Sequence, residues 1–166
     1  AGGRGASAVA SLVVTASGAF GASAIPAPSG AAASLPVYDF TTFAGKSTFG
    51  SVDGQGTAAR FNSSQGLAVD GAGNLYVADT SNATIRRITP SGAVTTLAGV
   101  AGQHGWSDGA AGTAHFSLPM GIAVDGNGVV YVADTGNRVI RKISPGGVVS
   151  TLAGSPGVLG AADGTG

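Results

Sequence analysis

Apolar residues in the second half of this chain fall in short runs that alternate with polar positions. Each run holds five to seven residues rich in Val, Ile, Leu, Tyr and Thr, and Gly, Asp, Asn or Pro separates it from the next run. No helical period fits, because Gly or Pro interrupts every window long enough for three helical turns. The pattern predicts four antiparallel strands, at residues 66–70, 74–80, 83–89 and 93–99.

The four-strand unit is present twice. Residues 66–99 and 121–154 align without a gap at a displacement of 55 positions, and 22 of the 34 residues are identical. A repeat of this length is typical of solenoids, propellers and arrays. Four antiparallel strands in one unit match a propeller blade, whose two apolar faces must each pack on a neighbour. We therefore predict an all-β fold, a β-propeller of four-stranded antiparallel blades, with two full blades present.

Four motifs within the unit resemble the bacterial NHL repeat. They are Gly-[Leu/Ile]-Ala-Val-Asp, Tyr-Val-Ala-Asp-Thr, Asn-x-x-Ile-Arg-[Arg/Lys]-Ile and Thr-Leu-Ala-Gly, preceded by an Asp-Gly pair and a Phe. The resemblance covers residues 37–166. It departs from the family where Ala83 and Arg138 occupy the usual His position. It implies a six-bladed propeller and an exported protein of bacterial type.

Composition narrows the classes of partner. The formal net charge is zero and only 10% of residues are charged, which argues against nucleic acid, since a nucleic-acid-binding domain presents a basic face. All eight acidic residues are Asp, which favours turns over helix interiors. The chain has no Cys, so thiol chemistry and disulfides are excluded.

The N-terminal residues predict an export signal. Residues 1–24 combine one basic residue, an apolar core and an Ala-x-Ala ending, as a signal peptide does. A disordered cytosolic tail is the alternative interpretation. The apolar run is too short for membrane insertion, and residues 25–36 form a low-complexity linker. The expected location is secreted, periplasmic or cell-envelope.

The ends of the repeat region indicate an incomplete propeller. Residues 37–44 resemble an orphan outer strand whose companion strands are not in the chain, so residues 37–166 are interpreted as a propeller fragment. Two blades leave two apolar faces uncovered. Self-association through these open faces is therefore expected.

Loops between blades, at residues 46–65 and 100–120, are the longest irregular segments and the expected place of function. Phe61 and Phe116 are predicted to fill the space between blades. Four loop residues that differ between the copies are candidate ligand contacts, namely Arg60, His104, Trp106 and His115. Arg60 and His115 occupy equivalent positions, and no equivalent is expected for His104 or Trp106.

Trp106 is the only tryptophan and lies in the Gly-rich sequence QHGWSDG, where burial would be difficult. An exposed indole is a candidate recognition element, and the alternative is a ring lying flat on the surface. His104 and His115 have no carboxylate at ligand spacing, so no metal site and no cofactor are predicted.

Recurring polar residues are predicted to have structural roles. An arginine in each third strand shares a face with apolar side chains, and a charge there requires a partner. We predict the pairs Asp79 with Arg86 and Asp134 with Arg141, or the same pairs across adjacent blades. Asn82 and Asn137 are expected to cap the turn between the second and third strands, and they complete the set of structural repeat positions.

Three classes of function follow from these features. The favoured one is an exported binding scaffold for a protein, a peptide or a cell-envelope glycan, with no catalytic residue in these two blades. The alternative, implied by the resemblance, is a metal-dependent lyase or lactonase-type propeller enzyme whose ligands lie mainly in missing blades. RNA binding, known for some NHL propellers, is disfavoured by the absence of a basic face.

Overall fold

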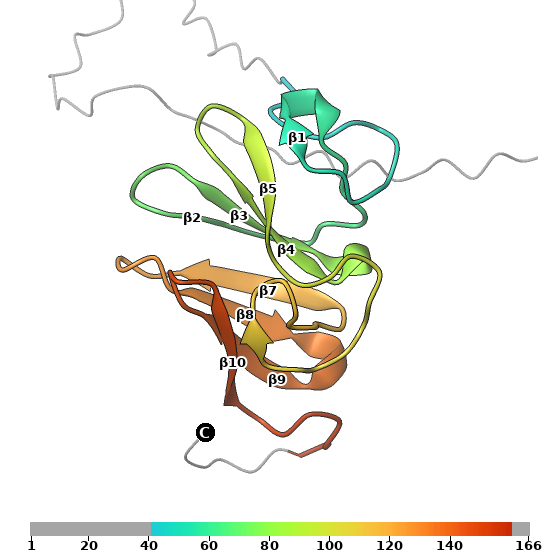
Figure 1. The fold of residues 1–166 in the computed structure, drawn as a ribbon, viewed down its shortest axis with the longest axis vertical. Helices are drawn as coiled ribbons and strands as arrows, with labels where there is room; N and C mark the ends of the chain where they lie inside the picture. The colour runs from blue at the N-terminus through green and yellow to red at the C-terminus, as the bar shows by residue number, and fades with distance from the viewer. Residues whose placement is uncertain (1–40, 161–166) are drawn as a thin grey trace, which may run out of the picture.

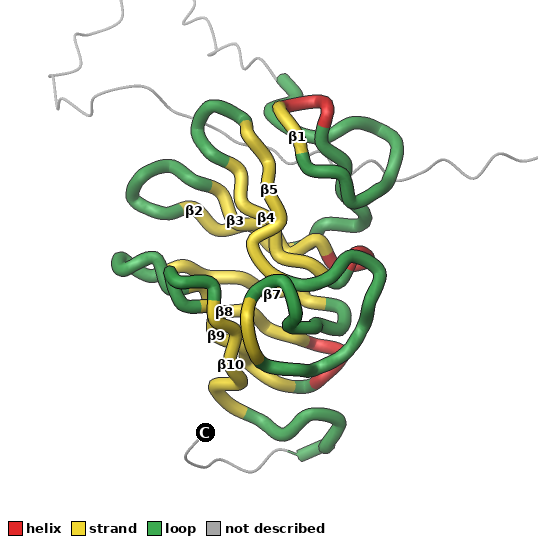
Figure 2. Tube along the Cα trace, in the orientation of Figure 1, coloured by secondary structure: helices red, strands yellow, loops and turns green. Residues whose placement is uncertain are grey.

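The computed structural model of the protein describes residues 41–160, which fold almost entirely as short β-strands and turns (Figure 2). The predicted segments at residues 1–24 and 25–36 lie outside the described residues. No helix within residues 41–160 has the length and apolarity needed to cross a membrane. The elements are β1 (Gly54–Gln55), η1 (Gly56–Ala58), β2 (Gly66–Val69), β3 (Leu75–Asp79), η2 (Thr80–Asn82), β4 (Thr84–Ile88), β5 (Ala93–Ala98), β6 (Gly109–Ala110), β7 (Pro119–Val124), β8 (Val130–Asp134), η3 (Thr135–Asn137), β9 (Val139–Ile143) and β10 (Val148–Ala153), where η marks a one-turn 3₁₀ helix.

The strands form two five-stranded antiparallel sheets of the same topology, in the orders β1-β5-β4-β3-β2 and β6-β10-β9-β8-β7. The consecutive strands β2 to β5 and β7 to β10 are the four-stranded blades that the sequence predicts. The fifth strand corrects that prediction. β1 and β6 are two-residue pieces of the inter-blade loops, too short to show a hydrophobic pattern, and each pairs with the outer strand of its sheet.

Residues 37–44, expected as an orphan outer strand, are only partly within the described range. The last four of them are described and form no strand. The glycine that follows nevertheless adopts the same left-handed backbone as its equivalents at the ends of β5 and β10, with φ of +94° at Gly45, +94° at Gly99 and +88° at Gly154. The glycine conformation that ends the fourth strand in each blade is therefore also present at Gly45.

The two sheets stack face to face, with the loop after β5 folded back beside them (Figure 1). Their main contacts run from β2 and β3 of the first sheet to β7 of the second. Branched and aromatic side chains from both sheets make one continuous core, because each strand turns alternate residues toward the neighbouring sheet. That core contains Tyr76, Ala78, Ile85, Ala98, Ala114, Phe116, Val130, Val132, Ile143 and Val149.

A second core covers the opposite face of the first sheet. It contains Ala59, Leu75, Val77, Ile88 and Val94, and the partly buried Ala44 and Phe61 pack against it. Phe116 lies fully buried between the two sheets, where the sequence places it. Phe61 occupies the equivalent position over the first sheet and is only half-buried.

One close approach fixes how the sheets meet. A methyl group added at Gly66 on β2 would lie 2.1 Å from the carbonyl oxygen of Met120 on β7, so only glycine fits there. Gly121 is its equivalent in the second sheet, 55 positions later. A methyl group there would meet only the Ala133 Cβ, at 3.4 Å. The second sheet therefore presents an open counterpart of a surface that is closed in the first.

Candidate functional site

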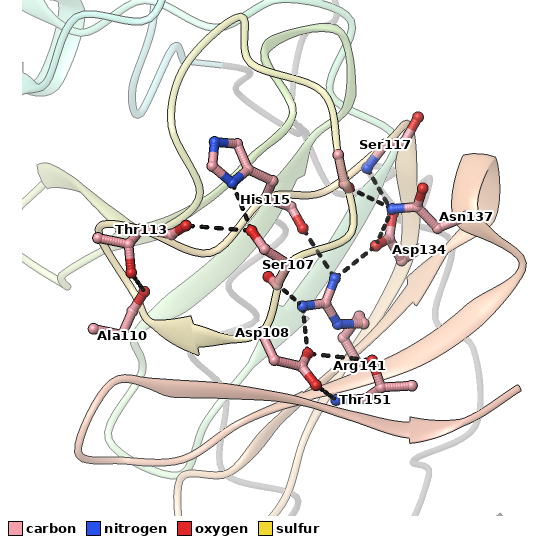
Figure 3. A network of polar contacts seen from close by, with 11 residues as sticks. Ser107, Asp108, Ala110, Thr113, His115, Ser117, Asp134, Asn137, Arg141 and Thr151 are labelled. Carbon is pink, nitrogen blue, oxygen red and sulfur yellow. Dashed lines mark hydrogen bonds and ion pairs between the residues drawn. The ribbon is translucent and has the colours of Figure 1, made fainter. Parts of the chain in front are cut away.

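The loop between β5 and β7 is held by a buried arginine. Arg141 lies in the middle of β9, and its side chain has no exposed surface. Its Nη1 donates to the carbonyl oxygen of His115 at 2.9 Å, and its Nη2 donates to that of Ser107 at 2.9 Å (Figure 3). The guanidinium therefore fixes the backbone at two loop residues.

Two carboxylates complete this anchor. Asp134 Oδ2 lies 3.1 Å from Arg141 Nη1, and Asp108 Oδ1 lies 2.7 Å from Nη2. Asp134 Oδ1 also accepts from the Ser117 amide at 2.7 Å, and Asp108 Oδ2 accepts from the Thr151 amide at 2.9 Å. Each carboxylate thus ties the loop to the sheet at a second point.

The first blade repeats the arrangement. Arg86 Nη1 lies 2.8 Å from Asp79 Oδ2, and Nη2 lies 2.6 Å from Asp53 Oδ1. The guanidinium also donates to the carbonyl oxygens of Arg60 at 2.9 Å and Val52 at 3.1 Å. Of the two arrangements expected for the aspartates of the second strands, the structure contains the ion pair within one blade, Asp79 with Arg86 and Asp134 with Arg141.

Sequence reasoning missed the second carboxylate of each pair. The sequence Asp-Gly at residues 53–54 and 108–109 is typical of a turn, whereas the two carboxylates each contact a buried guanidinium. The Asp-Gly pair recurs at the 55-residue displacement as regularly as Asp79 does, which indicates a structural position but does not identify the partner. No pattern in the sequence indicates that the loop folds back over the third strand.

An aromatic ring lies over each guanidinium. The Cζ atom of Arg86 is 5.0 Å from the centre of the Phe61 ring, and that of Arg141 is 5.1 Å from the centre of the Phe116 ring. Cation–π attraction is largest where the cation is removed from water, as both arginines are. Both phenylalanines therefore fill space and also stabilise a charge.

Burial and hydrogen bonding act in opposite directions on the aspartates. Burial raises the pKa of Asp79 and Asp134, and hydrogen bonds from loop and turn donors and from the arginine offset only part of that rise. At the more exposed Asp53, partial burial also favours a higher pKa. The Thr96 amide and the Arg86 guanidinium outweigh it, so the pKa of Asp53 lies below its usual value.

Asn82 and Asn137 do not cap the turns in which they lie. The amide of Asn82 donates to Asp79 Oδ2 at 2.7 Å and to the Gly50 carbonyl oxygen at 2.6 Å, and Asn137 bonds Asp134 and Gly105 in the same way. The turn itself closes through its own backbone, so it needs no side-chain cap. Both asparagines bridge the buried carboxylate to the inter-blade loop.

The anchored loop forms a small hollow on its exposed side. The hollow has a volume of about 270 Å³ and is lined by His104, Gly105, Trp106, Ser107 and His115. Trp106 is 62% exposed. The structure thus brings together three of the four candidate ligand contacts, namely both histidines and the tryptophan.

His115 is fixed by hydrogen bonds at both ring nitrogens. Nδ1 lies 2.7 Å from Ser107 Oγ, and Nε2 lies 3.2 Å from Gln103 Oε1. Because an amide oxygen only accepts, Nε2 carries the proton, and in the neutral ring Nδ1 accepts from the Ser107 hydroxyl, whose other contact is the Thr113 carbonyl oxygen at 3.4 Å. The group on the other side of the ring is the neutral amide of Gln103 rather than a carboxylate, and the two contacts hold the imidazole in one orientation. Ser107 and Gln103 had no distinguishing feature in the sequence.

Arg60 does not join this hollow. It lies in the first inter-blade loop, where its Nη1 donates to the carbonyl oxygens of Thr57, Ala58 and Ala59 at 2.9, 2.8 and 2.8 Å. It therefore closes the end of the 3₁₀ helix η1.

His104 and Trp106 do have counterparts, contrary to the sequence-based expectation. The Gly50 amide donates to Phe61 and the Gly105 amide donates to Phe116, both at 3.1 Å, so the two loops superpose in register here. Phe49 is then the equivalent of His104, and Ser51 is the equivalent of Trp106. These positions follow the same 55-residue displacement as the blades, although the first loop is one residue shorter before this point.

Within residues 41–160, no three His, Cys, Asp or Glu side chains lie close enough together to hold a metal ion. The two histidines of the hollow have no carboxylate beside them as a further ligand. The hollow presents an indole face beside imidazole, hydroxyl and amide groups.

Two stacked sheets, each built from four consecutive antiparallel strands and one loop strand, define this molecule as a pair of β-propeller blades. Solved structures agree. An auxiliary nutrient binding protein from Bacteroides thetaiotaomicron superposes with a TM-score of 0.54 at 29% identity, over 66% of this chain and 28% of that protein. A Bacteroides thetaiotaomicron protein of unknown function gives a TM-score of 0.52 at 35% identity, over 56% and 24%.

The repeated unit is an NHL repeat. A family model described as the teneurin NHL domain matches residues 102–162. NHL repeat-containing protein 2 of Bos taurus is 38% identical over 98 residues, which are 57% of this chain and 14% of that protein. Protein SUPPRESSOR OF QUENCHING 1, chloroplastic, of Arabidopsis thaliana is 38% identical over 96 residues, 57% of this chain and 9% of that protein. The matched region is thus a small part of each relative.

Proposed function

We propose that this pair of NHL blades is a binding module, and that the hollow around Trp106 contacts the ligand. The observation that carries the proposal is an exposed indole beside polar groups, on a loop that Arg141 holds at two carbonyl oxygens. A rigid scaffold that presents a fixed loop loses little conformational entropy when it binds. Exposed tryptophans are frequent energetic centres of recognition surfaces.

The ligand class that fits best is a saccharide. A hollow of about 270 Å³ holds a single ring rather than a drug-sized molecule, whose pockets span roughly 300–1,000 Å³. The indole provides an apolar face for the C–H side of a sugar. His104 provides a ring that can exchange hydrogen bonds with its hydroxyls, and the Ser107 hydroxyl oxygen keeps the capacity to accept one. A peptide that inserts one side chain is the competing ligand, and the test below separates the two.

Binding is expected to report on Trp106 directly, because it is the only tryptophan in the chain. Titration with oligosaccharides, including cell-envelope glycans, should shift and enhance indole fluorescence as the ring is covered. Trp106→Ala should weaken binding at least tenfold in calorimetry, since a lost stacking contact of about 1.4 kcal/mol has that effect.

The first loop supplies the matched control. Phe49 is also an exposed aromatic residue, two positions before Ser51, the equivalent of Trp106, but it lies in the other loop. Phe49→Ala should leave the affinity unchanged. A fluorescence response to peptides and not to glycans would mean that the hollow binds peptides. Equal loss in both variants, or no fluorescence response to any member of either class, would reject the site.

The proposed setting is outside the cytoplasm. Its support is the signal-like composition of residues 1–24 together with the likeness to a nutrient binding protein from Bacteroides at 29% identity. A fusion of residues 1–36 to a reporter that folds only after export should be active in a bacterial host. A reporter retained in the cytoplasm would contradict the proposed location.

A further inference from the structure

We propose that the second inter-blade loop hydrolyses small acyl esters, with Ser107 as the nucleophile, His115 as the general base and Gln103 as the residue that positions the base. These side chains form one series of hydrogen bonds. Ser107 Oγ lies 2.7 Å from His115 Nδ1 (Figure 3), and Nε2 lies 3.2 Å from Gln103 Oε1. A serine beside a base that a third group orients is the arrangement of nucleophilic hydrolases, and an amide side chain is the third group in some of them.

The protonation of the imidazole suits this role. The Gln103 oxygen accepts from Nε2, which leaves the lone pair of Nδ1 directed at the Ser107 hydroxyl. The other acceptor near that hydroxyl, the Thr113 carbonyl oxygen, is farther away at 3.4 Å. The hydroxyl proton is therefore within transfer distance of a base that is free to take it.

The loop does not need these side chains to fold. In the first loop, Val52 and Arg60 occupy the positions of Ser107 and His115. A buried arginine nevertheless binds the same two backbone carbonyl oxygens in each loop. The path of the loop is thus kept without a hydroxyl or an imidazole, and the serine and histidine are an addition that belongs to the second loop.

Each bond change in the reaction can be followed. Ser107 Oγ bonds to the carbonyl carbon of the ester while its proton moves to His115 Nδ1. The ester C–O bond then breaks, and the alcohol leaves with that proton. Water attacks the acyl carbon and gives a proton to Nδ1, and the acid is released as Oγ recovers the proton. One ester and one water become one acid and one alcohol, with no change of oxidation state.

The hollow limits the size of the ester. Its volume of about 270 Å³ suits an acetyl-sized acyl group with one ring as the leaving group, and the exposed indole of Trp106 provides an apolar wall for that ring. The backbone amides of Trp106 and Ser107 make no hydrogen bond with other groups of residues 41–160. Both can therefore donate to the charge that develops on the carbonyl oxygen. This activity goes beyond the proposed ligand binding and requires no saccharide.

The test uses p-nitrophenyl acetate as the substrate and a fluorophosphonate as a covalent probe, with the labelled residue located by peptide mass spectrometry. The full chain should hydrolyse the ester and be labelled at Ser107. His115→Gln should lower kcat/KM by about a hundredfold or more, the range for a lost general base, and should abolish labelling. Ser107→Ala should lose as much, because the two residues act as a unit.

Gln103 is tested through the pH dependence of the rate. Gln103→Leu should lower kcat with little change in KM, because the imidazole loses its orientation. Gln103→Glu should restore kcat and move the rise of the pH–rate profile to higher pH, since a carboxylate stabilises the protonated imidazole. A residue that only supports the loop would leave the profile where it is.

The first loop provides the control. Val52→Ser puts a hydroxyl at the equivalent exposed position with no imidazole in register, and that position should stay unlabelled. Three results would overturn the proposal: a wild-type rate no higher than that of Ser107→Ala, Ser107 labelling that persists in His115→Gln, or equal labelling of the first loop in Val52→Ser. None of these results alters the fluorescence response to saccharides, so the activity and the ligand site fail independently.

Discussion

Arg141→Met is expected to lower the free energy of unfolding by about 3–5 kcal/mol, the range seen when one partner of a buried ion pair is removed. The substitution leaves Asp134 as a buried charge without its cation. It also leaves the carbonyl oxygens of His115 and Ser107 without their donor. Urea unfolding followed by circular dichroism, at a concentration where the chain is monomeric, measures the loss.

The double variant Arg141→Met with Asp134→Leu distinguishes the contribution of the ion pair to stability from that of packing. It is expected to lose less stability than Arg141→Met alone, because no unpaired charge stays buried and the remaining carboxylate, Asp108, is half-exposed to water. If the single substitution costs no more than the double, the charge at Asp134 does not depend on Arg141, and the anchor assigned to this arginine is wrong.

Arg86→Met is the matched control for the binding site. Its contacts repeat those of Arg141, so its effect on stability should be similar. It anchors the other loop, however, and should leave the emission and quenching of Trp106 unchanged under conditions where both variants are folded. Arg141→Met should make the indole more accessible to a quencher, since His115 and Ser107 lose their anchor. Equal quenching in the two variants would mean that Arg141 stabilises the blade without positioning the hollow.

The features that could be predicted from the sequence are those that recur in both copies and lie in continuous segments of the chain. Strands β2 to β5 and β7 to β10 follow alternating apolar runs between Gly-rich turns, and the ion pairs within each blade follow from an arginine among apolar residues. These features depend on neighbours fewer than ten positions apart. The local pattern therefore contains most of the information.

Contacts between the loop and its blade could not be predicted in the same way. Asp53 and Asp108 reach arginines 33 positions away, and Asn82 and Asn137 reach loop carbonyl oxygens 32 positions away. Such pairs depend on where the irregular loop folds back onto its blade, and the periodicity of apolar residues does not encode the path of a loop. The hollow is a consequence of the same return, because Ser107 and His115 meet only once the loop has closed over Arg141.

Gly66→Ala should lower the free energy of unfolding by about 3 kcal/mol, at the upper end of the range for overpacking, because both contacts lie in backbone or in a core strand. The added methyl group would lie 2.1 Å from the Met120 carbonyl oxygen and 3.1 Å from Ile122 Cγ2. Neither β2 nor β7 can shift without separating the sheets. Thermal and urea unfolding of the monomer measure the change.

The same substitution at Gly121 is the control, since it has the same chemistry at the equivalent strand position. Its nearest contact at 3.4 Å is ordinary, so the stability of the dilute monomer should change by less than about 0.5 kcal/mol. Equal destabilisation by the two substitutions in the dilute monomer would mean that the glycine serves the strand itself rather than the approach of a neighbouring blade.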